Sequence, residues 1–201
     1  VLQWALKTPG IYWVVSPTYR QGKQNHWLNL KKEIPREWIQ NSNEVEISIT
    51  LKNGSIIELK GAENPDSLRG AIINGLCVDE IASIHNWEWL WEEVLSATMV
   101  RHDAPAIFIS TPKGFNAFYE LFNKGQGNEL NWKSWHFTSY NNPYLSKGVI
   151  DEKKKELTED TFMQEYMADF RKHTGIAHKE WDREINFIEE FEIPSNWQRA
   201  R

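Results

Sequence analysis

The sequence predicts an α/β fold with a mostly parallel central sheet flanked by helices. Two short apolar runs carry this prediction, because each ends in a polar pair: one in Asp79-Glu80 and the other, further along, in Ser110-Thr111. Buried parallel strands read as unbroken apolar runs, and ligands lie beyond the carboxyl ends of such strands. We therefore expect the two polar pairs to lie side by side in one crevice.

The acidic pair suits nucleotide hydrolysis. Asp79 can hold a hydrated Mg²⁺, and Glu80 can orient or deprotonate the attacking water. The hydroxyls of Ser110 and Thr111 can sense a γ-phosphate or position that water. The alternatives are an ordinary polar strand end for the acidic pair and a helix cap or turn before Pro112 for the hydroxyl pair.

The elements before the acidic pair begin with residues 1–8, which read as the last turns of a helix that Pro9-Gly10 ends. Residues 11–15 form an apolar strand pattern. A helix over about 20–32 follows, with Ser16 or Thr18 as its cap.

A hairpin comes next along the chain. Residues 45–51 alternate strictly between apolar and polar, as a half-buried strand does. Asn53-Gly54 is a strong turn signal, and residues 56–59 return as the second strand. Residues 65–70 read as a loop that leads to the strand with the acidic pair.

The second half alternates helices and strands again. We expect helices at about 87–95, 115–122, 147–157 and 159–171, and strands at 106–110 and 132–138. The later strand is predicted from its alternation, and the break before the last two helices from Asn-Asn-Pro.

Composition limits the possible functions. The chain has 201 residues and a formal charge of −5, which argues against broad coating of its surface by nucleic acid but permits a local basic groove. Cys77 is the only cysteine, so an intrachain disulfide is excluded and a reducing compartment is indicated. No apolar stretch approaches the roughly 20 residues of a membrane span.

Several other chemistries lack their residues. A phosphate loop needs Gly-x-x-x-x-Gly-Lys-Ser/Thr after a strand, and the sequence has none. Residues 21–24 come nearest but lack the hydroxyl, and we interpret them as surface. Glu58 and Lys60 have the Glu-x-Lys spacing of a metal nuclease, but the required Asp does not precede them. The six histidines show no zinc-ligand spacing.

Seven segments, taken in order and spacing, resemble the ATPase domain of the large terminase subunit of tailed bacteriophages. They are residues 13–20, 53–57, 65–70, 78–80, 109–114, 138–143 and 164–170. The resemblance covers about residues 1–185. It implies a three-layer P-loop NTPase fold of the ASCE (RecA-like) type, with a mostly parallel central sheet between layers of helices.

The resemblance also implies roles for single residues. Asp79 matches the Walker B aspartate that holds Mg²⁺ through water, and Glu80 matches the catalytic glutamate. Ser110 and Thr111 match the motif that couples hydrolysis to movement. Arg69 lies in the loop where the family places a candidate arginine finger, which acts on a neighbouring subunit. The alternative for Arg69 is an ion pair with Asp66 that pins the loop.

The implied protein is an ATP-hydrolysing motor that uses ATP and Mg²⁺ to translocate viral double-stranded DNA into a procapsid. In the family the motor is coupled to a nuclease that cuts DNA concatemers. The implied partners are the DNA, the portal protein, the small terminase subunit and further copies in a homo-oligomeric ring, with no membrane. The implied location is the cytoplasm of a bacterial host, with the gene carried by a virus or prophage.

The resemblance implies boundaries as well. Residues 1–174 are expected to be a partial ATPase domain whose Walker A segment lies upstream, with 132–174 as a lid-like subdomain. Residues 175–201 are expected to lead to a nuclease domain beyond the chain, and this polypeptide alone is expected to be inactive. Two alternatives stay open: another nucleic-acid translocase of the same ASCE fold, and a non-catalytic assembly module without a phosphate loop.

Overall fold

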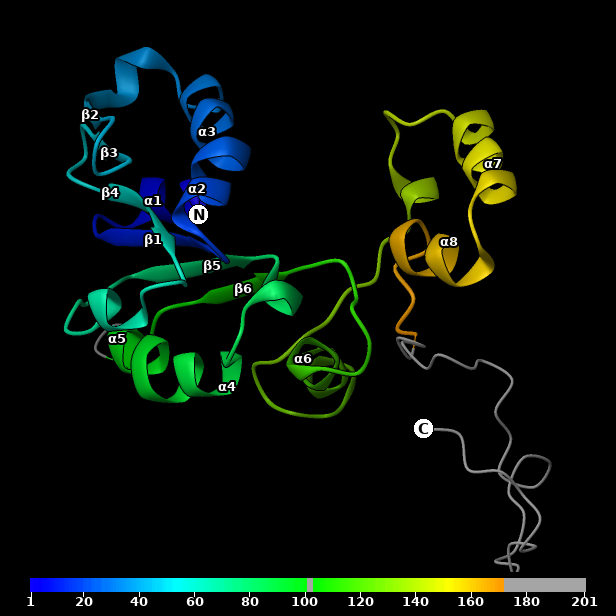
Figure 1. Ribbon diagram of the computed structural model, residues 1–201. Coiled ribbons are helices and arrows are strands. Elements are labelled where there is room, and N and C mark those ends of the chain that lie inside the picture. The colour runs from blue at the N-terminus through cyan, green and yellow to red at the C-terminus, as the bar shows by residue number, and fades with distance from the viewer. Residues whose placement is uncertain (101–102, 172–201) are drawn as a thin grey trace, which may run out of the picture.

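The computed structural model describes residues 1–100 and 103–171, and its centre is one six-stranded sheet with the order β2-β3-β4-β1-β5-β6 (Figure 1). Strands β4, β1, β5 and β6 run parallel, whereas β2 and β3 pair antiparallel at one edge. The strands are β1 Ile11–Ser16, β2 Ile39–Asn43, β3 Ser48–Leu51, β4 Ile56–Gly61, β5 Gly75–Asp79 and β6 Ala106–Ile109. The mostly parallel sheet predicted from the sequence is confirmed.

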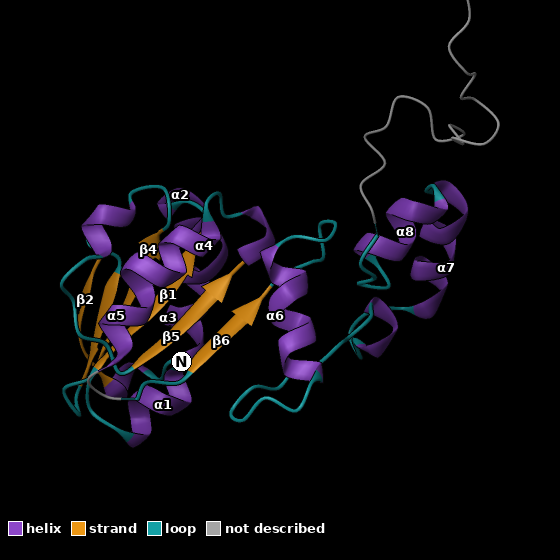
Figure 2. Ribbon diagram, turned by 90° about the horizontal axis from the view of Figure 1, so that it is seen from below, coloured by secondary structure: helices purple, strands orange, loops and turns teal. Residues whose placement is uncertain are grey.

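Helices cover both faces of this sheet (Figures 1 and 2). Helices α1, α2 and α3 lie on one face, and α4, α5 and α6 lie on the other. The helices are α1 Leu2–Lys7, α2 Tyr19–Gly22, α3 Leu28–Glu33, α4 Trp87–Leu90, α5 Ser96–Met99, α6 Ala117–Gln126, α7 Lys147–Glu156 and α8 Glu159–Glu165. π-helical turns join α2 to α3 (Lys23–Trp27) and α4 to α5 (Trp91–Leu95).

Alternation along β1 divides the apolar core between the two faces. Tyr12 points into the cluster under α1 to α3, together with Trp27 and Ile57. Trp13 and Val15 point into the opposite cluster under α4 and α5. Each face of the sheet is thus covered by its own helices, although Ile107 and Ile109 of β6 remain exposed, and this is the three-layer arrangement that the resemblance implies.

Helices α7 and α8 lie apart from the sheet in both views (Figures 1 and 2). Ile150 and Phe162 are buried in this part of the chain. After α8, Phe170 contacts helix α6. Its ring lies 5.1–5.8 Å from the rings of Phe118, Tyr119 and Phe122. The part of the chain that the structure describes contains no helix of the length and apolarity that crossing a membrane requires.

The predicted strand at 132–138 is wrong, because these residues have no regular secondary structure. Their burial does not alternate along the whole segment: Trp132 stacks on Phe108 of β6 at 6.1 Å, whereas Trp135, His136 and Phe137 are all exposed. A strand needs a partner for its backbone groups, and this segment pairs with no strand of the described sheet.

Other boundaries also differ from the prediction. Strand β3 begins only at Ser48, because Ile47 adopts a left-handed backbone with φ of 45°. The strand β2 was not predicted at all, since its sequence is mostly polar and exposed. Residues Pro65–Leu68 of the predicted loop form a 3-10 turn.

Two helices differ at their ends. Helix α6 begins at Ala117 rather than near residue 115, because the Asn116 side chain caps it. Helix α8 ends at Glu165 rather than at 171. The predicted connector at 175–201 falls outside the described residues.

Candidate functional site

The two predicted polar pairs meet at the carboxyl ends of β5 and β6. Asp79 is the last residue of β5 and lies opposite Ile109, the last residue of β6. Glu80 and Ser110 follow directly, and the Ser110 hydroxyl lies within hydrogen-bond distance of Oε2 of Glu80, at 3.4 Å. The structure thus brings both polar pairs to one edge, as expected for parallel strands.

The Ser110 side chain joins the two loops that leave these strands. Its Oγ accepts a hydrogen bond from the backbone N–H of Ala82 at 3.2 Å. Its one hydrogen is shared between the Glu80 carboxylate and the carbonyl of Thr111, which lies 3.0 Å away. Thr111 enters this network through its backbone. A single hydroxyl therefore links the loop after the acidic pair to the hydroxyl pair.

Glu80 has an unusual backbone. Its φ of 54° and ψ of 41° place it in the left-handed region, which is uncommon for a residue other than glycine. The following residues turn at once into the 3-10 turn Ile81–Ser83. This sharp turn directs the Glu80 side chain toward β6 instead of continuing the strand.

The environment of Glu80 disfavours its charge. Burial raises the pKa of this carboxyl above its ordinary value, and the neighbouring Asp79 carboxylate adds to that effect. The Lys113 ammonium and the Ser110 hydrogen bond act in the opposite direction, while Glu165 raises the pKa slightly further. A glutamate with a raised pKa is a better proton acceptor for water, which suits a general base.

Lys113 is a cation that the sequence analysis missed. Its Nζ donates to the Ser83 hydroxyl at 2.6 Å, which fixes the ammonium beside the turn that follows Glu80. Asn116 supports the same turn by donating to the Ala82 carbonyl at 3.3 Å. The signal was present in the sequence, because Lys113 comes three residues after Ser110.

Asp79 also has a partner that the sequence analysis missed. Nε2 of His26 lies 2.8 Å from Oδ2 of Asp79, and the two residues are far apart along the chain. His26 belongs to the π-helical turn between α2 and α3. The spacing of residues in the sequence does not predict this contact, because it depends on how the π-helical turn lies relative to the end of β5.

Arg69 contacts residues other than Asp79, Glu80 and Ser110. Its Nε donates to Asp66 at 2.9 Å, its Nη1 donates to the Glu93 carbonyl at 2.9 Å, and its guanidinium lies 5.3 Å from the Trp89 ring centre. The alternative of an ion pair with Asp66 is therefore present in the structure. The side chain is 44% exposed, so it also remains open to another molecule.

The oxygen atoms of Asp79 and Ser16 are of the kind that Mg²⁺ prefers. Within residues 1–100 and 103–171, no three His, Cys, Asp or Glu side chains gather as a metal site. Mg²⁺ needs no such set, since it keeps several waters and takes one or two carboxylates together with phosphate oxygens. Asp79 offers the carboxylate, and the buried Ser16 hydroxyl at the end of β1 lacks a hydrogen-bond partner among the described residues.

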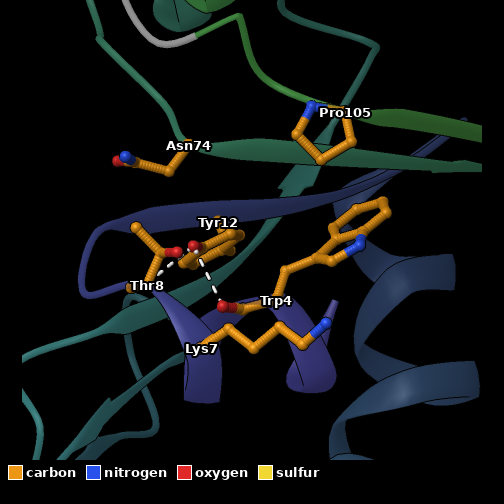
Figure 3. A pocket seen from close by; sticks show the side chains of 6 residues that line it. All are labelled: Trp4, Lys7, Thr8, Tyr12, Asn74 and Pro105. Atoms are coloured by element: carbon orange, nitrogen blue, oxygen red, sulfur yellow. Dashed lines mark hydrogen bonds between the residues drawn. The ribbon is translucent and has the colours of Figure 1, made fainter.

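A cavity of about 250 Å³ lies at the opposite, amino-terminal edge of the strands (Figure 3). Its lining residues are Trp4, Lys7, Thr8, Tyr12, Asn74 and Pro105. The Tyr12 hydroxyl already donates to the carbonyl of Thr8 at 2.7 Å. No carboxylate lines this cavity, and it is separate from Asp79 and Glu80.

Glu58 and Lys60 contact each other on β4. Lys60 Nζ lies 3.2 Å from Glu58 Oε2, and the same carboxylate accepts from the Trp13 indole at 2.7 Å. Of residues 21–24, three are exposed as expected, but Gly22 is buried. A Cβ at Gly22 would lie 3.2 Å from the Ser16 hydroxyl, so helix α2 packs closely on β1 there.

Comparison with known proteins gives one family and several similar structures. Residues 8–180 match the family described as terminase large subunit, T4likevirus-type, N-terminal. The large terminase subunit of Escherichia phage T5 is 32% identical over 165 residues, which are 81% of this chain and 37% of the phage protein. The chain therefore matches well under half the length of this relative.

Two solved structures share the fold. The large terminase ATPase domain of Thermus phage P74-26 superposes with a TM-score of 0.70 at 25% identity, over 83% of this chain and 79% of that one. The large terminase of another thermophilic bacteriophage, in complex with ADP, has a TM-score of 0.69 at 19% identity, over 84% of this chain and 43% of that one.

Proposed function

Because the chain belongs to the family of N-terminal domains of T4-like terminase large subunits, we propose that it supplies the hydrolytic half of an ATPase site in a viral DNA-packaging motor. The observation that carries the proposal is the cluster, here called the acidic crevice, in which Asp79 and Glu80 meet Ser110 at the ends of adjacent parallel strands. The motor would move double-stranded DNA into a procapsid.

Each residue of the crevice has a distinct role in this proposal. Asp79 would hold Mg²⁺, which when bound would supply charge neutralisation at the phosphates. Glu80 orients the attacking water and accepts its proton, helped by its raised pKa. Ser110 and Thr111 connect the state of Glu80 to the loop after β6, and so couple hydrolysis to movement.

The substrate is ATP. The terminase of the second thermophilic phage has been solved in complex with ADP and with ATP-γ-S, and the shared fold supports the same ligand class for this chain. Since the sequence has no Gly-x-x-x-x-Gly-Lys-Ser/Thr, the phosphate loop would come from a segment outside these 201 residues.

The sheet offers a place for such a segment. Ile107 and Ile109 of β6 are 43% and 50% exposed, although parallel strands are normally buried on both faces. They lie in register with Cys77 and Asp79, so they share a sheet face with the metal-holding carboxylate. A strand beside β6 with its following helix would cover these side chains and bring phosphates to Asp79.

The remaining parts of the proposal concern the rest of the motor. Residues 132–174 would act as a lid-like subdomain over the nucleotide, and 175–201 would lead to a nuclease that cuts concatemers. The portal protein, the small terminase subunit and further copies in a ring would be the partners in the host cytoplasm. These roles are those that the family membership supports.

The test is a DNA-packaging reaction with the complete terminase, portal-containing procapsids and ATP. The readout is DNA protected from added nuclease. We expect Asp79→Asn to abolish protection while the protein still binds procapsids. If Asp79→Asn packages DNA like the unmodified protein, the chain acts as an assembly module and the motor proposal is overturned.

A further inference from the structure

We infer that His26 is a positioning residue for Asp79. It holds one carboxylate oxygen of Asp79 in place and leaves the other oxygen for the hydrated metal. This inference rests on the proposed function, since it assigns a partner to the carboxylate that would hold Mg²⁺. The observation that carries it is the 2.8 Å contact between His26 Nε2 and Asp79 Oδ2.

The contact has a defined donor and acceptor. An ionised carboxylate only accepts hydrogen bonds, so Nε2 of His26 carries the hydrogen and donates it. Oδ2 of Asp79 is thereby fixed, and the orientation of the carboxylate is set. Partners of this kind, which orient a metal-holding side chain from behind, tune metal affinity.

The helix that carries His26 is built to place it there. The π-helical turn Lys23–Trp27 changes the angular spacing of its residues relative to an α-helix. Trp27 is thus buried in the core, where its indole donates to Glu44 at 2.6 Å, while His26 faces the strand end. Short π-helical insertions are rare and occur often at functional sites.

The same helix is fixed at its start. The Thr18 hydroxyl accepts from the N–H of Gln21 at 3.2 Å, and Gly22 packs against Ser16 at the end of β1. A cap, a close glycine contact and a buried tryptophan therefore hold the turn on both sides of His26. A histidine held this firmly can fix the orientation of Asp79.

A purely stabilising ion pair is the simpler interpretation of this contact. The side chains of His26 and Asp79 are 32% and 19% exposed, and partly exposed pairs contribute little to stability. The two interpretations differ in what they predict for metal binding. A positioning role changes metal affinity, whereas a weak stabilising pair leaves it unchanged.

The test uses the complete terminase with a non-hydrolysable ATP analogue and Mn²⁺ in place of Mg²⁺. Bound Mn²⁺ is measured by electron paramagnetic resonance, which does not depend on turnover. We expect His26→Ala to weaken Mn²⁺ binding by about tenfold, as loss of such partners does elsewhere. Urea unfolding of each variant checks that the fold is kept.

Two conservative variants sharpen the result. The amide nitrogen of glutamine can reach the position of Nε2, whereas that of asparagine is too short. His26→Gln should therefore retain Mn²⁺ affinity within about twofold, and His26→Asn should behave like His26→Ala. Gln24→Ala is the matched control, because Gln24 is exposed on the same turn.

The results for the unmodified protein and for His26→Ala distinguish a failure of this inference from a failure of the proposed ATPase site. If unmodified terminase binds Mn²⁺ with the analogue and His26→Ala binds it equally well, His26 has no positioning role. If the unmodified protein binds no Mn²⁺ with the analogue, the proposed ATPase site itself is contradicted.

Discussion

Glu80 combines two states that an ordinary surface glutamate avoids. Its backbone is left-handed, with φ of 54°, and its carboxyl is partly desolvated beside Asp79. A left-handed conformation costs about 1–2 kcal/mol for a residue with a Cβ. Such costs persist where the surrounding structure imposes them and a site requires them.

The raised pKa of Glu80 predicts how stability depends on pH. A raised pKa means that the folded state favours the neutral carboxyl. The contribution to stability is therefore complete below the ordinary glutamate pKa and is lost as pH rises through the higher folded pKa. At pH 7.5 the ionised Glu80 should weaken the fold.

Glu80→Gln removes this charge, so the variant should resist urea better than the unmodified protein at pH 7.5. The advantage should shrink toward zero near pH 3.5, below the ordinary glutamate pKa, where the carboxyl is protonated in both the folded and the unfolded chain. The measurement is the urea midpoint of the complete ATPase domain at both pH values. An advantage of equal size at both values would show that charge is not its cause.

The residues of the site differed in how well the sequence predicted them. Asp79, Glu80 and Ser110 were predictable, because strand ends in a parallel sheet meet at one edge. His26 was not, since its contact depends on a π-helical turn that no residue pattern reveals. Lys113 was visible next to the hydroxyl pair, but its role depends on the fold of the turn after Glu80.

The strands made of continuous apolar residues were predicted from the sequence. The polar strand, which forms only beside a neighbouring strand, was not. Strands β1, β5 and β6 are continuous apolar runs and lie where expected. Residues 132–138 have a strand pattern, but they pair with no strand of the sheet that the structure describes. Polar β2 forms only because β3 lies beside it.

The exposed side of β6 predicts a difference between two similar substitutions. Ile109 and Val149 are 50% and 51% exposed, and both are β-branched. If another strand and helix cover β6 in the complete protein, Ile109→Lys should destabilise it by about 2 kcal/mol or more. Val149→Lys, on α7, should change stability by less than about 0.5 kcal/mol.

Chemical denaturation of the complete protein measures both free energies of unfolding. Equal, small effects would mean that β6 is a true edge of the sheet. The phosphate loop would then have to reach Asp79 from elsewhere.

In the assembled ring, Arg69 would act at the ATPase site of a neighbouring subunit. In this chain its guanidinium is held by Asp66, the Glu93 carbonyl and the Trp89 ring, and no hydrogen bond of the described residues joins it to Glu80. We propose that Arg69, whose side chain is 44% exposed, exchanges these contacts for the phosphates bound by a neighbouring subunit. Arginines supplied in trans accelerate phosphoryl transfer by about 10³–10⁵.

Arg69→Ala should therefore lower ATP hydrolysis by the assembled ring about 10³-fold or more, with nucleotide affinity nearly unchanged. Arg36→Ala is the matched control, since Arg36 is also exposed. Mixed rings of Arg69→Ala and Glu80→Gln subunits should recover part of the activity, because intact sites form between unlike neighbours. Normal turnover by Arg69→Ala rings would eliminate the trans role.

The most direct measurement for the whole account is single-turnover ATP hydrolysis by the complete terminase carrying Glu80→Gln. We expect nucleotide affinity within about twofold of the unmodified protein and hydrolysis slower by at least about 10²-fold, because the water loses its proton acceptor. Glu88→Gln, an exposed glutamate on α4, is the control and should hydrolyse ATP normally. Hydrolysis by Glu80→Gln at the unmodified rate would contradict the assignment of this crevice as the hydrolytic centre.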